Sequence, residues 1–211
     1  MAEKWVWLPD WAFDLSLWED ELSDVADASH SFISYEKLAG QLENPYKLPG
    51  MSAANVVVAS GLGALSLMLA SKNRPKNQKW ILLSAFADFC DEESSWTEPG
   101  LLFLAKQLKT ALEPTLNTFG EVFAEEFEDW EEDWFNAAKK MNPELLAQGL
   151  EFLATHQLKE PLENSSDIQV IYGKMDKAIV PSRTEKLQEF LPEASFRERP
   201  KAGHWPPMLL L

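Results

Sequence analysis

The stretch 55–70 joins a short strand to a helix through a tight turn, and such turns can present a reactive side chain. Val56 to Ala59 predicts a strand buried on both faces, and Ala64 to Ala70 predicts a helix. Between them, Ser60-Gly61-Leu62-Gly63 has the small residues that a strained position and a close backbone approach require. The pattern Gly-x-Ser-x-Gly, whose serine carries out acyl transfer, aligns here with Gly61 at the nucleophile position. The turn therefore predicts a catalytic architecture that lacks its attacking hydroxyl.

Strands alternate with helices along much of the sequence. The predicted strands are 4–8, 31–35, 56–59, 79–84, 168–172 and 195–197. Besides 64–70, a helix is predicted over about 182–190, and Asp14 and Ser16 offer N-caps for another. This alternation predicts an α/β fold with a mostly parallel sheet of about six strands and right-handed crossovers.

The segment 87–167 shows helical periodicity and no convincing strand. We therefore expect a helical insertion after the fourth strand of the sheet. The domains would be 1–86 together with 168–211 for the α/β core, and 87–167 for the insertion. Ligand sites of open α/β sheets lie outside the carboxyl ends of the strands. Four segments are expected there: 9–12, 60–63, 173–181 and 202–206.

Composition limits the classes of function. The 211 residues, of which 45% are hydrophobic and 25% charged, suit a globular α/β domain with one core. The formal net charge of −15 argues against nucleic acid and anionic membrane surfaces as partners. A single cysteine, Cys90, excludes an internal disulfide and a cysteine-based metal cluster, and we expect neither a metal nor a cofactor. We also expect no signal peptide and no membrane span, and hence a cytoplasmic protein.

Two segments near the end of the sequence each place one polar residue that could take part in catalysis within a distinctive sequence motif. They are YGKMDKAIVP, which contains Asp176, and KAGHWPP, which contains His204. Four further segments are LPDWAFDLSLWEDEL, ASGLGAL, SAFADFCDEESSWTEP and QGLEFLATHQLKEPLE. Through these segments the sequence resembles the α/β-hydrolase family, and most closely the pimeloyl-acyl-carrier-protein methyl ester esterases of biotin synthesis. The chain order of nucleophile position, acid and histidine agrees with that family.

The resemblance implies the α/β-hydrolase fold and ester hydrolysis by a catalytic triad. By this resemblance, Asp176 would orient and stabilise His204, and His204 would act as general base and then as general acid. The backbone N–H groups of Trp11 and Leu62 would form the oxyanion hole.

Two departures from the family pattern act against catalysis. Gly61 has no side chain to attack an ester, and loss of a triad nucleophile typically costs on the order of 10⁶ in rate. Pro9-Asp10 stands where the family has His-Gly, and this carboxylate would oppose the developing negative charge unless it turned away from the oxyanion hole. Ser60 and Cys90 are alternative nucleophiles. However, Ser60 lies one residue early and is expected to point away from His204, and Cys90 is expected to be a small buried hydrophobe.

Aromatic residues recur within the insertion at spacings of four, four, three and four. They are Phe119, Phe123, Phe127, Trp130 and Trp134. These spacings place all five on one face of a single helix. We expect this helix to be a lid over the active site, and we assign to the substrate pocket Ser60, Phe119, Phe123, Phe127 and Trp130. Packing of the insertion on itself is the alternative.

The remaining positions of this helix are strongly acidic, and the segment 113–133 contains no Lys or Arg. Acyl carrier protein, the partner that the resemblance implies, is itself acidic, and like charges repel during encounter. A small soluble ester, an apolar ligand or a basic partner fits this charge better.

Three functions remain open. The first is a carboxylic-ester hydrolase scaffold with weak or absent activity, in which Gly61→Ser is expected to create activity on short aryl esters. The second is a catalytically silent relative that binds a ligand or a protein through the same pocket. The third is nucleotide binding, because Gly61-Leu62-Gly63 follows a strand and precedes a helix, although the third glycine of that fingerprint is Ser66. Beyond the last strand, Leu209, Leu210 and Leu211 are expected to be exposed.

Overall fold

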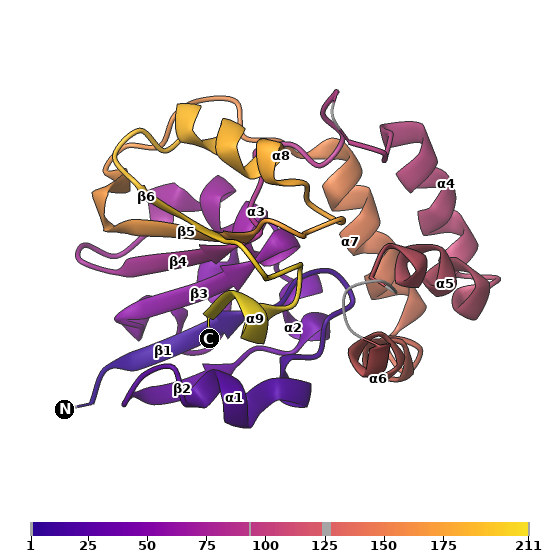
Figure 1. Cartoon of the computed structure of the whole chain (residues 1–211), viewed down its shortest axis with the longest axis horizontal. Helices are drawn as coiled ribbons and strands as arrows, with labels where there is room; N and C mark the ends of the chain where they lie inside the picture. The colour runs from indigo at the N-terminus through magenta and orange to yellow at the C-terminus, as the bar shows by residue number, and fades with distance from the viewer. Residues whose placement is uncertain (1, 93, 124–127, 211) are drawn as a thin grey trace.

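A six-stranded sheet flanked by helices forms the centre of the molecule (Figure 1). The computed structural model describes residues 2–92, 94–123 and 128–210. Helices α4 to α7 are grouped at one end of the sheet, beyond the carboxyl ends of the strands.

All neighbouring strands of the sheet are parallel. The strands are β1 (Lys4–Leu8), β2 (Ser29–Phe32), β3 (Val56–Ser60), β4 (Lys79–Leu83), β5 (Ile168–Gly173) and β6 (Ser195–Arg199). Their order across the sheet is β2-β1-β3-β4-β5-β6, which confirms the predicted parallel sheet of about six strands. The second strand lies earlier than the predicted segment 31–35, because its pairing with β1 begins at Ser29 and a helix already starts at Tyr35.

The central strand β3 explains how two functional loops come together. Every residue of β3 is buried, as expected for an apolar run between two parallel neighbours. Leu8 at the end of β1 pairs with Ala59 near the end of β3. The segments that follow these two strands therefore start side by side at one edge of the sheet.

Short helices connect the strands of the core, and one more helix, α9, follows the last strand. They are α1 (Glu19–Ser23), α2 (Tyr35–Ala39), α3 (Gly61–Leu69), α8 (Pro181–Lys186) and α9 (Pro206–Leu210). A 3₁₀ turn, Leu187–Glu189, follows α8 directly. The expected exposure of Leu209 is wrong: its side chain is fully buried in α9, and the Arg199 guanidinium donates hydrogen bonds to the carbonyls of Leu209 and Leu210 at 2.8 and 3.0 Å. Leu211 lies outside the described residues.

The described residues between β4 and β5 form four α-helices. They are α4 (Glu98–Leu108), α5 (Leu112–Phe123), α6 (Glu128–Ala138) and α7 (Pro143–Thr155). The helices α4 and α7 pack against each other. Asp88 and Gln157 form an isolated antiparallel bridge, which ties together the two ends of this helical segment.

The prediction of one aromatic helix over 119–134 is wrong, because α5 and α6 fold back on each other. A Cβ added to Gly120 of α5 would lie 3.2 Å from Glu131 Oε1 and 3.6 Å from Trp134 Cζ3 of α6. In one continuous helix, residues 120 and 134 would be about 21 Å apart at 1.5 Å per residue. In the folded-back pair, Phe119 of α5 and Trp134 of α6 are both buried, at 6% and 0% exposure.

Candidate active site

The turn between β3 and α3 has the strained geometry predicted from its sequence. Gly61 adopts a φ of +43°, in the left-handed region that disfavours side chains. A Cβ on Gly63 would lie 2.6 Å from the Pro9 carbonyl oxygen, so this position requires glycine for a different reason. Close approach of the segment after β1 thus places Asp10 and Trp11 against the start of α3.

A carboxylate and an imidazole meet beside this turn. Asp176 follows β5, and His204 follows β6. His204 Nδ1 lies 2.9 Å from Asp176 Oδ2. The same oxygen accepts a hydrogen bond of 2.7 Å from Ser84 Oγ, and Asp176 Oδ1 accepts one of 2.8 Å from the Ile179 N–H. Because Asp176 is buried and held on both oxygens, it orients the imidazole rigidly.

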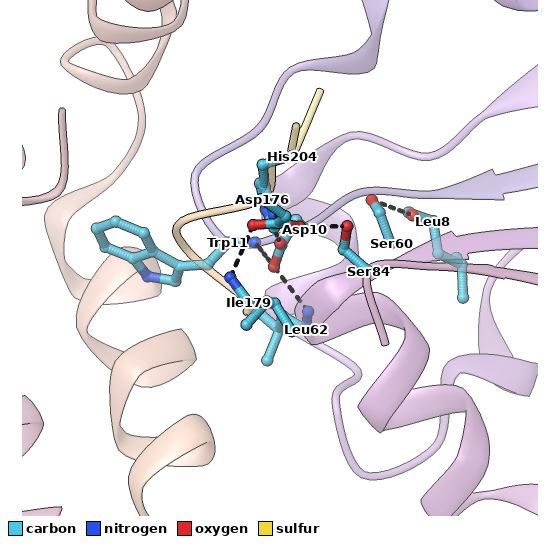
Figure 2. Close-up of polar contacts among 9 residues, drawn as sticks. All are labelled: Leu8, Asp10, Trp11, Ser60, Leu62, Ser84, Asp176, Ile179 and His204. Atoms are coloured by element: carbon cyan, nitrogen blue, oxygen red, sulfur yellow. Dashed lines mark hydrogen bonds and ion pairs between the residues drawn. The ribbon is translucent and has the colours of Figure 1, made fainter. Parts of the chain in front are cut away.

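Asp10 fills the predicted oxyanion hole with its own carboxylate (Figure 2). Asp10 Oδ1 accepts hydrogen bonds from the N–H groups of Trp11 at 2.6 Å and Leu62 at 2.7 Å. Asp10 Oδ2 lies 2.9 Å from His204 Nε2. The expectation that this carboxylate opposes an oxyanion unless it turns away misses its position: Asp10 turns inward and takes the oxyanion's place.

The same carboxylate also fills the space of the absent nucleophile side chain. A Cβ added to Gly61 would overlap Cγ, Oδ1 and Oδ2 of Asp10. No larger residue fits at position 61 unless Asp10 moves. Gly61 and Asp10 are therefore complementary in shape, although 51 positions separate them in the sequence.

His204 lies between two carboxylates, and this decides its charge. Burial alone would lower the pKa of His204, but the charge of Asp176 and the hydrogen bonds and charge from Asp10 and Asp176 outweigh burial and raise it well above its ordinary value. The imidazole is then protonated near neutral pH, and its two nitrogens donate to the two carboxylates. A protonated imidazole cannot accept a proton as general base.

A small aromatic cavity adjoins Asp10 and His204. Its volume is about 40 Å³, enough for water-sized molecules but far below typical ligand pockets. Its lining comprises Asp10, Trp11, Phe13, Phe89, Trp96, Phe119, Val122, Leu153, Ala178, Ile179 and His204. The Trp11 indole N–H donates to the Leu146 carbonyl of α7 at 2.9 Å, which ties the segment after β1 to a helix that also lines the cavity.

Of the residues predicted to line the pocket, some lie at the cavity and others lie elsewhere. Phe119 lines the cavity, with its ring centroid 4.4 Å from that of Trp11. Trp130 instead packs against Trp18 and Trp205 at 5.8 and 6.2 Å. Ser60 Oγ donates to the Leu8 carbonyl at 3.5 Å, and Figure 2 shows Ser60 beside Leu8, apart from the group of Asp10, Asp176 and His204. Phe127 and the side chain of Phe123 lie outside the described residues.

Cys90 is a poor substitute for the missing nucleophile. Burial and then the charge of Asp88 raise the pKa of its thiol to about 11, so almost no thiolate exists at neutral pH. The side chain is half-buried rather than fully buried. Within the described ranges, no group of three or more His, Cys, Asp or Glu side chains is arranged to hold a metal ion, and no helix is long and apolar enough to cross a membrane.

Sequence reasoning placed Asp10 beside the oxyanion hole but missed its role there, and it missed Ser84 as a member of the site. For Ser84 no signal exists in the sequence, because its hydroxyl reaches Asp176 only through the adjacency of β4 and β5. For Asp10 a signal exists: a carboxylate replaces an expected glycine, and a glycine replaces an expected serine, within one predicted site. Treating these two departures as a pair would have indicated that one side chain fills the space left by the other.

Known structures share this arrangement of strands and helices, although no protein-family model and no curated protein sequence matches the chain. An esterase from Exiguobacterium antarcticum is 16% identical with a TM-score of 0.73, over 97% of this chain and 86% of that one. An enol-lactonase from Burkholderia xenovorans is 14% identical with a TM-score of 0.68, over 94% and 83% of the two chains. An epoxide hydrolase from Bacillus megaterium is 14% identical with a TM-score of 0.62, over 97% and 87%. The chain therefore has the α/β-hydrolase fold.

Proposed function

We propose that this chain is a carboxylic-ester hydrolase scaffold in which Asp10 and Gly61 together silence ester hydrolysis. One observation carries the proposal: the Asp10 carboxylate lies where both a nucleophile side chain and the oxyanion of a tetrahedral intermediate would lie. The two N–H donors that would stabilise developing charge already bind a resting negative charge. An ester carbonyl then has neither an attacking group nor an oxyanion hole.

The proposal includes descent from an esterase of biotin synthesis, supported by the sequence segments that contain Asp176 and His204. We propose a small acyl ester as its ancestral substrate rather than an acyl carrier protein. Exposed Glu121, Glu132 and Asp133 on α5 and α6 would repel an acidic carrier. The cavity of about 40 Å³ also favours a short acyl group.

Nucleotide binding has less support. A phosphate at the start of α3 would need the Leu62 N–H, which donates instead to Asp10. Ser66, at the third position of the glycine fingerprint, donates its hydroxyl to the Leu42 carbonyl at 2.6 Å inside the core.

The test is to replace both members of the pair. The double variant Asp10→Gly/Gly61→Ser empties the oxyanion hole and supplies a hydroxyl next to His204. We expect hydrolysis of p-nitrophenyl acetate at least about 10³-fold above the wild-type chain, since a triad nucleophile contributes on the order of 10⁶ in rate. Gly61→Ser alone, the change suggested by the sequence, is not expected to suffice, because Asp10 still occupies the space.

Controls assign any recovered activity to the site. The triple variant, which adds His204→Gln, should lose the gain because the base is absent. A fluorophosphonate probe should label the double variant at the serine introduced at position 61, and should not label the wild-type chain. A folded double variant that hydrolyses the ester no faster than the triple variant, and that the probe does not label, would refute the proposal.

A further inference from the structure

We infer that the donors around Asp10 form a binding site for a small monocarboxylate with a short apolar tail, and that the Asp10 side chain is its tethered occupant. This inference rests on the proposed function, because it concerns the same silenced site. It adds the chemical class of ligand that the site recognises.

The donor set matches one carboxylate group. One oxygen of Asp10 accepts from two backbone N–H groups, Trp11 and Leu62, and the other faces the His204 imidazole at 2.9 Å. All three donors are buried, and hydrogen bonds to a charged acceptor are about twice as strong as neutral ones. A free carboxylate placed here would keep all three contacts.

The charges around the site select a monoanion. Asp176 neutralises the imidazolium from the opposite side, at 2.9 Å from Nδ1. A neutral amide would leave the Nε2 donor without a negative partner, whereas a dianion such as phosphate would add a second charge close to Asp176. A carboxylate with one charge fits between these limits.

The surrounding space sets the size of the ligand. Asp10 lines the aromatic cavity of about 40 Å³. Removing its side chain would join the volume of one acetate to this cavity. Phe119, Trp96 and Leu153 line the cavity and would contact an alkyl tail of a few carbons. A longer or branched acid would need movement of α5 or α7, which supply part of this lining.

Tethering explains why the wild-type chain is expected to ignore free acids. A side chain held next to its site has a high effective concentration, so a free acid of the same chemistry competes poorly with it. The ligand site becomes measurable when Asp10 is shortened.

The experiment compares Asp10→Gly with the wild-type chain in sodium acetate against sodium chloride at equal ionic strength. We expect a saturable rise in the melting temperature of Asp10→Gly with acetate and no such rise in the wild-type chain. Butyrate should bind more tightly than acetate, by roughly fourfold for each methylene that becomes buried. Acetamide and phosphate should have no effect, and the added change His204→Gln should abolish the response to acetate.

The result that overturns the inference is an Asp10→Gly variant that shows no saturable response to acetate, or that responds equally to acetamide. If this variant does not fold in chloride, refolding is attempted in acetate and in acetamide. Recovery in acetate alone supports the site, and failure in both contradicts it. This test needs no nucleophile, so ester turnover by Asp10→Gly/Gly61→Ser without acetate binding by Asp10→Gly would reject the inference while leaving the proposed function intact.

Discussion

The two halves of the candidate site differ in how closely they match the catalytic arrangement that the sequence resemblance implies. On one side, Asp176 holds His204 with the support of Ser84 and the Ile179 N–H. On the other side, Asp10 occupies the oxyanion hole, and Gly61 leaves room for it. The first half retains its proton-handling geometry. In the second half, the N–H groups of Trp11 and Leu62 and the His204 imidazole all bind the Asp10 carboxylate.

Under the proposed function, this difference teaches that one carboxylate can oppose ester hydrolysis in three ways. The Asp10 carboxylate excludes a nucleophile side chain, saturates the oxyanion donors and pairs with the imidazole. Removal of the serine alone would leave a vacant but otherwise competent site, with a residual ~10³ to 10⁴ in rate over water.

The largest expected effect on stability comes from placing a side chain at Gly61, in the half of the site that contains Asp10. Gly61→Ser should destabilise the protein by about 3–5 kcal/mol, because the new Cβ overlaps the Asp10 carboxylate and breaks its buried pair with His204. Urea unfolding measures this change. In the Asp10→Gly background the same substitution should cost only about 1–2 kcal/mol for its left-handed backbone. Equal costs in both backgrounds would show that the two residues do not compete for space.

The pH dependence of stability tests whether His204, which contacts Asp10 in one half of the site and Asp176 in the other, is protonated. The folded-state pKa of His204 lies well above its unfolded value of 6.5, so its stabilisation is fully present below pH 6.5 and is lost as pH rises towards the folded pKa. The loss reaches about 1.4 kcal/mol per pH unit. In Asp10→Asn one flanking charge is absent, the pKa of His204 falls, and the loss spans a shorter pH range. Urea unfolding of both proteins between about pH 6 and pH 9 compares the ranges, and identical pH profiles would contradict the ion pair.

The smallest effects come from two serines that provide a matched comparison. Ser84→Ala should cost about 1.5–2 kcal/mol, because it removes a 2.7 Å donor to the buried Asp176 carboxylate. Ser60→Ala should cost less than about 1 kcal/mol, because its hydroxyl makes only a 3.5 Å contact with the Leu8 carbonyl. Melting temperatures of the two variants measure both changes. If Ser60→Ala lowered the stability more than Ser84→Ala, the Asp176–His204 half of the site would not depend on Ser84 as the geometry indicates.

Much of the fold was predictable because its signals are local. Lys4–Leu8 was predicted with its observed bounds, and the apolar run at 56–59 identified the central strand. The prediction of helices in the insertion failed where the same local sequence pattern is compatible with two different folds. The aromatic spacing over 119–134 suits one helix as well as two, and only the tertiary contact of Gly120 with Glu131 and Trp134 shows the folded-back pair.

The candidate site was likewise predictable in part. Sequence patterns identified the segments of Asp176 and His204 and the glycine at the turn, and the structure brings all three together. Whether they act in catalysis stays a prediction. Trp130 shares a sequence spacing with Phe119 but packs elsewhere, because α6 turns it towards Trp18 and Trp205.

The sequence by itself determined the alternation of strands and helices and the strained turn at Gly61, since each depends on residues that are close in sequence, and it identified the segments of Asp176 and His204 by resemblance. Only the tertiary structure decided what Asp10 does. Its carboxylate meets a glycine 51 residues away and a histidine 194 residues away. Hydrogen bonds and steric exclusion act over a few ångströms, so their outcome depends on how the segments pack and not on any local pattern.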